Sequence, residues 1–118
     1  MNKKIIALFF SFCSAYAVAE CGKNLGCYEK QLQTNKKALN QAFEKLVQAD
    51  KEKMTLESFQ RSQILWNQFI KADCQFMNAP MAMTLGEGSQ VAMFECLDAH
   101  YQQRIRQIQQ MVQELEKE

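Results

Sequence analysis

The chain is poor in residues that interrupt helices, with one proline and four glycines among 118 residues. Such a composition favours helices over turn-rich folds. Its single histidine, His100, has no nucleophile beside it once the cysteines are oxidised, so the residues of Ser-His or Cys-His catalysis are lacking. We therefore expect a protein that is not an enzyme and carries no cofactor.

Long apolar runs are also lacking, except for one at the N-terminus. Two lysines precede the run from Ile5 to Val18, and Ala17 and Ala19 are small residues that suit signal-peptide cleavage. This pattern predicts a secretory signal peptide over residues 1–19, with export to the periplasm or out of the cell. The run is short for a membrane span and no second run follows, so we expect one domain over residues 20–118 and no span.

An excess of charge of either sign is absent as well. Removing Lys3 and Lys4 with the signal peptide lowers the Lys and Arg count from 14 to 12, against 13 Asp and Glu, which leaves a net charge of −1. This balance provides no electrostatic attraction for nucleic acid or an anionic membrane. The partner that we expect is another protein, and the oligomeric state is left open.

Apolar residues recur at intervals of three and four over three segments, which predicts an all-α fold. We expect the first helix to end near Asp50, the second to start at an N-cap at Thr55, and the third to follow an N-cap at Ser89. These helices would form a small up-down-up bundle. The expected core positions are Tyr28, Leu32, Leu39, Phe43 and Leu46, then Leu56, Phe59, Trp66, Ile70 and Met77, then Phe94, Leu97, Tyr101, Ile108, Val112 and Leu115.

The second helix carries a further apolar stripe, formed by Leu65, Phe69 and Phe76. Two adjoining stripes indicate that this helix contacts two neighbours.

One long irregular segment is expected between the second and third helices, from Asn78 to Ser89. It contains the only proline and two of the four glycines. Long loops in small domains often carry binding residues. The segment is therefore our candidate recognition loop, and its candidate contact residues are Asn78, Pro80, Met81, Met83 and Glu87.

Four cysteines remain after removal of the signal peptide: Cys21, Cys27, Cys74 and Cys96. An even number in a small exported chain predicts two disulfides, although four cysteines allow three connectivities. In an up-down-up bundle all four lie at one end, where geometry permits any pairing. The simplest arrangement joins Cys21 to Cys27 and Cys74 to Cys96, and the second bond would close the candidate recognition loop.

Two polar residues interrupt the apolar stripes, Asn35 in the first helix and Arg104 in the third. At about 1.5 Å of rise per residue, Arg104 lies near the level of Gln63 and Trp66, counted from the cysteine end. We hypothesise a polar layer of Arg104, Gln63 and Asn35 that packs against Trp66. The alternative is that Arg104 extends along the apolar surface to reach water.

The segment SQILWNQFIKADC, from Ser62 to Cys74, resembles the Ala-Gln-x-x-Trp-x-x-Phe/Tyr-Arg-Asp-x-x-Cys signature of the lysozyme-inhibitor LprI-like family, a group of small exported bacterial domains. The direct matches are Gln63, Trp66, Phe69 and Cys74. The departures are Ser62, Ile70 and Lys71. An upstream element of the family is similar to Leu39, Asn40 and Phe43, and a downstream block is similar to Gly88, Ser89, Cys96 and Arg104.

The resemblance implies an exported binding protein that inhibits lysozyme by presenting a disulfide-closed segment to the enzyme's cleft. Two alternatives stay open. One is a cell-envelope interaction module with another protein partner, exposing Met77, Met81 and Met83. The other is a copper(I) site formed by these methionines with Met93 and His100, because thioether sulfur suits that ion.

Overall fold

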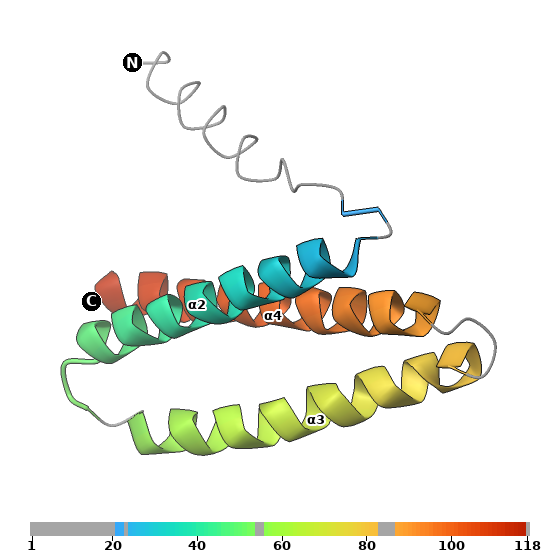
Figure 1. Cartoon of the computed structure of the whole chain (residues 1–118). Helices are drawn as coiled ribbons and strands as arrows, with labels where there is room; N and C mark the ends of the chain where they lie inside the picture. The colour runs from blue at the N-terminus through green and yellow to red at the C-terminus, as the bar shows by residue number, and fades with distance from the viewer. Residues whose placement is uncertain (1–20, 23, 54–55, 83–86, 118) are drawn as a thin grey trace, which may run out of the picture.

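The computed structural model describes residues 21–22, 24–53, 56–82 and 87–117, without the side chains of residues 79–82 and 87. The described residues form three helices and no strand: α2 (Leu25–Ala49), α3 (Leu56–Ala82) and α4 (Glu87–Glu116). The chain runs up α2, down α3 and up α4 (Figure 1), which confirms the all-α up-down-up bundle. Within these ranges no helix has an apolar stretch that could cross a membrane. The expected signal peptide lies outside the described residues.

Local hydrogen bonds define both ends of α2. The side chain of Asn24 accepts a bond from the backbone N–H of Cys27 at 3.3 Å, which satisfies one of the donors that a helix start leaves free. At the other end the N–H of Asp50 donates to the carbonyl of Leu46 at 3.0 Å, so the helix ends where it was expected. Lys53 follows with a φ of 54°, a left-handed conformation that favours glycine.

Helix α4 packs against both other helices, whereas α2 and α3 make little contact with each other. One contact between α2 and α3 is the stacked pair Phe43 and Phe59, with ring centroids 4.5 Å apart. Each helix contributes one apolar side chain that is only 1% exposed: Leu46, Ile70 and Ile108. The core is completed by Leu32, Leu39, Ala42, Phe59, Tyr101 and Val112. Eight of the sixteen expected core positions are thereby buried, and five more pack against them while partly buried: Phe43, Trp66, Phe94, Leu97 and Leu115. Tyr28 and Leu56 are partly exposed.

The expectation that α3 contacts two neighbours through adjoining stripes was wrong. Leu65, Phe69 and Phe76 are 59%, 57% and 76% exposed. Met77, expected in the core, is 61% exposed. The physical reason is that α3 packs mainly on α4, and one stripe is enough for one neighbour. The second stripe is left without a covering helix in the described part of the chain.

The expected irregular segment from Asn78 to Ser89 was also wrong over most of its length. Helix α3 continues past Pro80 to Ala82, and α4 begins at Glu87, so Gly88 and Ser89 are helical and Ser89 is not the N-cap. Proline has no N–H to donate to the carbonyl of residue 76, so α3 continues through its last turn with one backbone hydrogen bond fewer. The side chain of Asn78 also donates to the Cys74 carbonyl at 2.8 Å, one turn back. Residues 83–86, and Met83 with them, lie outside the described residues.

Candidate functional site

A polar cluster joins α4 to α3 around Arg104. Its Nε donates to Oε1 of Gln63 at 2.7 Å, and its Nη2 donates to Oγ of Ser62 at 2.9 Å. The guanidinium carbon lies 5.4 Å and 5.8 Å from the ring centroids of Phe59 and Trp66, within the range of a cation–π contact. Partial burial lowers the pKa of Arg104 from its ordinary value, and the group remains charged at neutral pH. The predicted association of Arg104 with Gln63 and Trp66 is confirmed.

Replacing Arg104 with leucine is expected to lower the free energy of unfolding by about 1–2 kcal/mol. Gln63 and Ser62 would lose their donor, and leucine offers none. Urea unfolding measures the change, and the matched control is Arg106→Leu at an exposed position of the same helix, which should stay within about 0.5 kcal/mol of the parent. A neutral or stabilising Arg104→Leu would mean that this cluster does not hold α3 on α4.

Asn35 does not belong to this cluster, so that part of the predicted layer was wrong. Its amide donates instead to Oδ1 of Asp98 on α4. Oδ2 of the same carboxylate accepts from Gln31 at 3.2 Å and from Gln102 at 3.1 Å. Burial raises the pKa of Asp98, and the bond from Gln102 offsets part of that rise. Arg104 and Asn35 were expected in one layer, but they belong to different helix contacts. Arg104 joins α4 to α3, and Asn35 joins α2 to α4.

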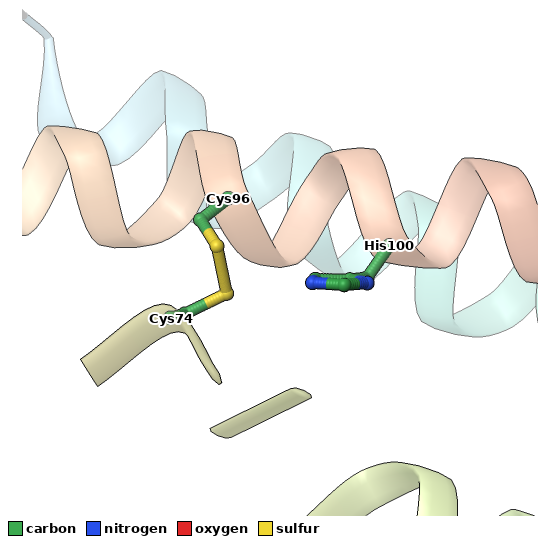
Figure 2. A group of neighbouring side chains, drawn as sticks. All are labelled: Cys74, Cys96 and His100. Atoms are coloured by element: carbon green, nitrogen blue, oxygen red, sulfur yellow. A yellow bond between two sulfur atoms is a disulfide. The ribbon is translucent and has the colours of Figure 1, made fainter. Parts of the chain in front are cut away.

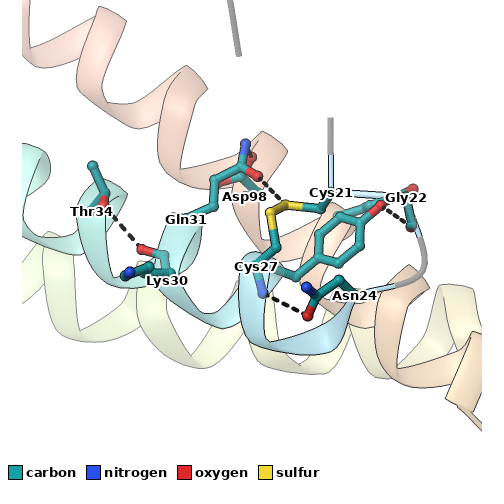
Figure 3. The surroundings of a disulfide bond; sticks show 10 residues. Cys21, Gly22, Asn24, Cys27, Lys30, Gln31, Thr34 and Asp98 are labelled. Atoms are coloured by element: carbon teal, nitrogen blue, oxygen red, sulfur yellow. Dashed lines mark hydrogen bonds between the residues drawn. A yellow bond between two sulfur atoms is a disulfide. The ribbon is translucent and has the colours of Figure 1, made fainter. Parts of the chain in front are cut away.

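The disulfides pair Cys21 with Cys27 and Cys74 with Cys96, as in the simplest predicted arrangement. The first bond ties the N-terminal segment onto the first turn of α2, beside the Asn24 cap (Figure 3). The second joins α3 to α4 and is referred to below as the clasp. Cys74 is fully buried, whereas Cys96 is partly exposed.

His100 lies beside the clasp, one turn after Cys96 on α4. Its ring extends from α4 toward the two sulfur atoms (Figure 2). Its Nε2 is 2.9 Å from Oδ2 of Asp73, and both side chains are partly exposed. The ring of Phe69 meets the imidazole edge-on, with centroids 5.9 Å apart. Two helices therefore place a histidine, a carboxylate and a disulfide together at one end of the bundle.

An open groove of about 740 Å³ runs along α3 beside the Arg104 cluster. Two guanidinium groups line it, Arg61 and Arg104, with Glu57 as the one acidic residue of the lining. The apolar part of the lining comes from Leu65, Trp66 and Phe69.

The groove continues into an exposed strip that we call the α3 face, formed by Arg61, Leu65, Phe69 and Phe76. Steps of four, four and seven residues keep these positions on one side of a helix. At about 1.5 Å per residue the strip is roughly 22 Å long. Large apolar side chains that gather on an exposed surface mark interaction sites more often than scattered ones do.

The other predicted site residues are distributed over the bundle. Asn78 and Ser89 line a second groove of about 510 Å³ near the clasp, together with Met93. Met93 and His100 were predicted as copper(I) ligands. In the structure Sδ of Met93 accepts from the Asn78 amide at 3.8 Å, and His100 bonds to Asp73. The side chains of Pro80, Met81, Met83 and Glu87 are not described, so their recognition role and the copper(I) site stay predictions.

Sequence reasoning missed three features of these sites. Ser62 was noted only as a departure from a family motif, yet it accepts from Arg104. Asp98 was not singled out, although it precedes Gln102 by one helical turn, a spacing at which two polar side chains can bond on one face of a helix. The apolar residues of the α3 face, Leu65, Phe69 and Phe76, were expected to contact a second helix, because periodicity alone does not separate a buried stripe from a binding stripe.

One comparison with known proteins identifies a family. The model of the family described as lysozyme inhibitor LprI matches residues 13–116, nearly the whole chain. No curated protein and no solved structure matches the chain.

Proposed function

The chain belongs to the LprI lysozyme-inhibitor family, and from this premise we propose that it is an exported, non-enzymatic protein that binds a lysozyme and blocks its cleft. The signal-peptide pattern over residues 1–19 supports export. The observation that carries the proposal is the α3 face. It leaves Leu65, Phe69 and Phe76 more than half exposed on a helix whose other side is already packed on α4.

An amphipathic helix face is a common way to fill a groove on a partner protein, with anchors at helical spacing. Phe69 and Phe76 are seven residues apart, two turns of one helix, and both present aromatic rings to solvent. Aromatic side chains that become buried on binding carry a large share of interface energy. The clasp supports this use of α3, because a helix held at a fixed position loses little freedom when it binds.

Charge on the α3 face also suits a glycosidase cleft. Such clefts contain two carboxyl groups that flank the scissile bond. Arg61 is exposed at the start of the strip, and no ion pair joins it to a carboxylate within the described ranges. A guanidinium can bind a carboxylate through two parallel hydrogen bonds. We therefore assign Arg61 to the enzyme's carboxylates, with Leu65 and Phe69 packed on the cleft wall beside it.

The test is inhibition of lysozyme on bacterial cell walls by the purified protein and its variants. The double variant Phe69→Ser, Phe76→Ser is expected to weaken inhibition at least roughly 30-fold, the effect of losing one strong aromatic anchor. The matched control is Met111→Ser, which alters an exposed apolar side chain on α4 outside the α3 face and should inhibit like the parent. Melting temperatures of all three proteins establish that the fold is kept.

Two results would contradict the proposal at different levels. Full lysozyme activity in the presence of excess parent protein would overturn the function for the enzyme tested. Inhibition that is equally strong in the parent and in the double variant would leave the function standing and overturn the assignment to the α3 face.

A further inference from the structure

We propose that the clasp and His100 form a redox-controlled zinc site. Sγ of Cys74, Sγ of Cys96 and a ring nitrogen of His100 all lie within 4.8 Å of one another. While the disulfide is intact, its sulfur atoms are not thiolates and do not bind zinc. Once the disulfide is reduced, the same three atoms provide two thiolates and one imidazole, a ligand set that zinc favours.

The spacing of the three atoms fits a tetrahedral ion. Zinc–sulfur bonds of about 2.3 Å place two thiolates roughly 3.8 Å apart at the corners of a tetrahedron. The Cα atoms of Cys74 and Cys96 are 5.7 Å apart, so each sulfur reaches its corner by a small side-chain rotation with the helices in place. His100 follows Cys96 by four residues on α4, which places both side chains on the same face of that helix.

Asp73 holds His100 only in the disulfide form of this site. Its Oδ2 lies 2.9 Å from Nε2 of His100, and one imidazole nitrogen cannot bind a carboxylate and zinc at once, so zinc binding at Nε2 displaces Asp73. It is not among the three atoms that cluster within 4.8 Å, so it is assigned no bond to the metal. Three protein ligands leave the fourth position of the ion to water.

The partial exposure of the site allows both reduction of the disulfide and entry of zinc. Cys74 is fully buried, but Cys96 and His100 are partly exposed, so a reductant and a metal ion can reach the site from the side of α4. An external dithiol would break the Cys74–Cys96 bond by exchange, giving two electrons and two protons to the two sulfurs while it becomes a disulfide itself. Zinc binding then displaces both thiol protons. The disulfide form locks α3 to α4 without metal, and the reduced form regains the link through zinc.

Cobalt(II) is the probe for this site, because it takes the place of zinc and absorbs light when bound to thiolate. The Cys21→Ala, Cys27→Ala variant isolates the clasp, since only Cys74 and Cys96 then remain in the mature chain. After anaerobic reduction with a phosphine and removal of the reductant, this variant is expected to bind one cobalt ion with a thiolate charge-transfer band, and one equivalent of zinc should abolish the band. The oxidised form should show no band.

A further variant tests the imidazole ligand in the same background. His100→Ala is expected to weaken cobalt binding more than 10-fold. Zinc should also raise the melting temperature of the reduced parent background but not that of its His100→Ala form. The proposal is overturned if the reduced protein binds no more cobalt than the oxidised protein, or if His100→Ala leaves both the affinity and the band unchanged.

Discussion

Replacing Cys74 and Cys96 together with alanine is expected to lower the free energy of unfolding by about 3 kcal/mol. The clasp joins residues 22 positions apart, and the chain-entropy model gives a stabilisation of this size for a loop of that length. Alanine is the suitable replacement because Cys74 is fully buried, and a serine hydroxyl would need a hydrogen-bond partner there. Urea unfolding under non-reducing conditions measures the loss.

The other disulfide provides the matched control. Cys21 and Cys27 are only six positions apart, so the same double replacement there should cost about 1 kcal/mol less. Hydrogen exchange should separate the two variants further. Loss of the clasp should speed exchange mainly in α3, because α3 has little contact with α2 and depends on α4. Equal stability of the two double variants, with unchanged exchange in α3, would show that the clasp is not what holds α3.

Ile108→Ala is expected to lower the free energy of unfolding by about 3 kcal/mol, from the lost burial and the cavity left behind. Ile108 is 1% exposed and belongs to α4, the helix on which both others pack. A loss at this position should therefore weaken the whole bundle, and a single cooperative transition should shift to lower urea concentration with an unchanged slope.

Met111 is three residues further along the same helix and 43% exposed, which makes Met111→Ala the control for helix propensity and side-chain size. It should cost less than about 1 kcal/mol. Ile108→Val should fall between the two, at about 1 kcal/mol. If Ile108→Ala cost no more than Met111→Ala, the packing of this part of α4 would differ from the one described.

Features that depend on short-range periodicity could be predicted from the sequence. The spacing of Leu32, Leu39 and Leu46 identified α2 and its buried face, and all three are in the core. Helix lengths placed all four cysteines at one end of an up-down-up bundle, and the observed pairing of Cys74 with Cys96 is part of the simplest of the three connectivities that this left open. The contact of Arg104 with Gln63 followed from the same count of helical rise.

Features that depend on how helices are arranged around one another could not be predicted in this way. Phe69 and Phe76 have the spacing of core residues, and only the packing of α3 on one neighbour shows that they are exposed. Asn35 has Asp98 as its partner because α2 and α3 lie on different sides of α4. Helical rise gives the level of a residue along the bundle axis, but it does not show which neighbouring helix the residue contacts. Pro80 suggested a helix end, but α3 continues two residues beyond it to Ala82.

The position of α4 in the chain determines when this protein can fold. Both α2 and α3 are made before it, and apart from the Phe43–Phe59 stack between them their apolar sides pack mainly on α4. The two earlier helices therefore have no stable tertiary partner until the 30 residues of α4 have followed them. The core, to which all three helices contribute, is therefore completed only by the last of them.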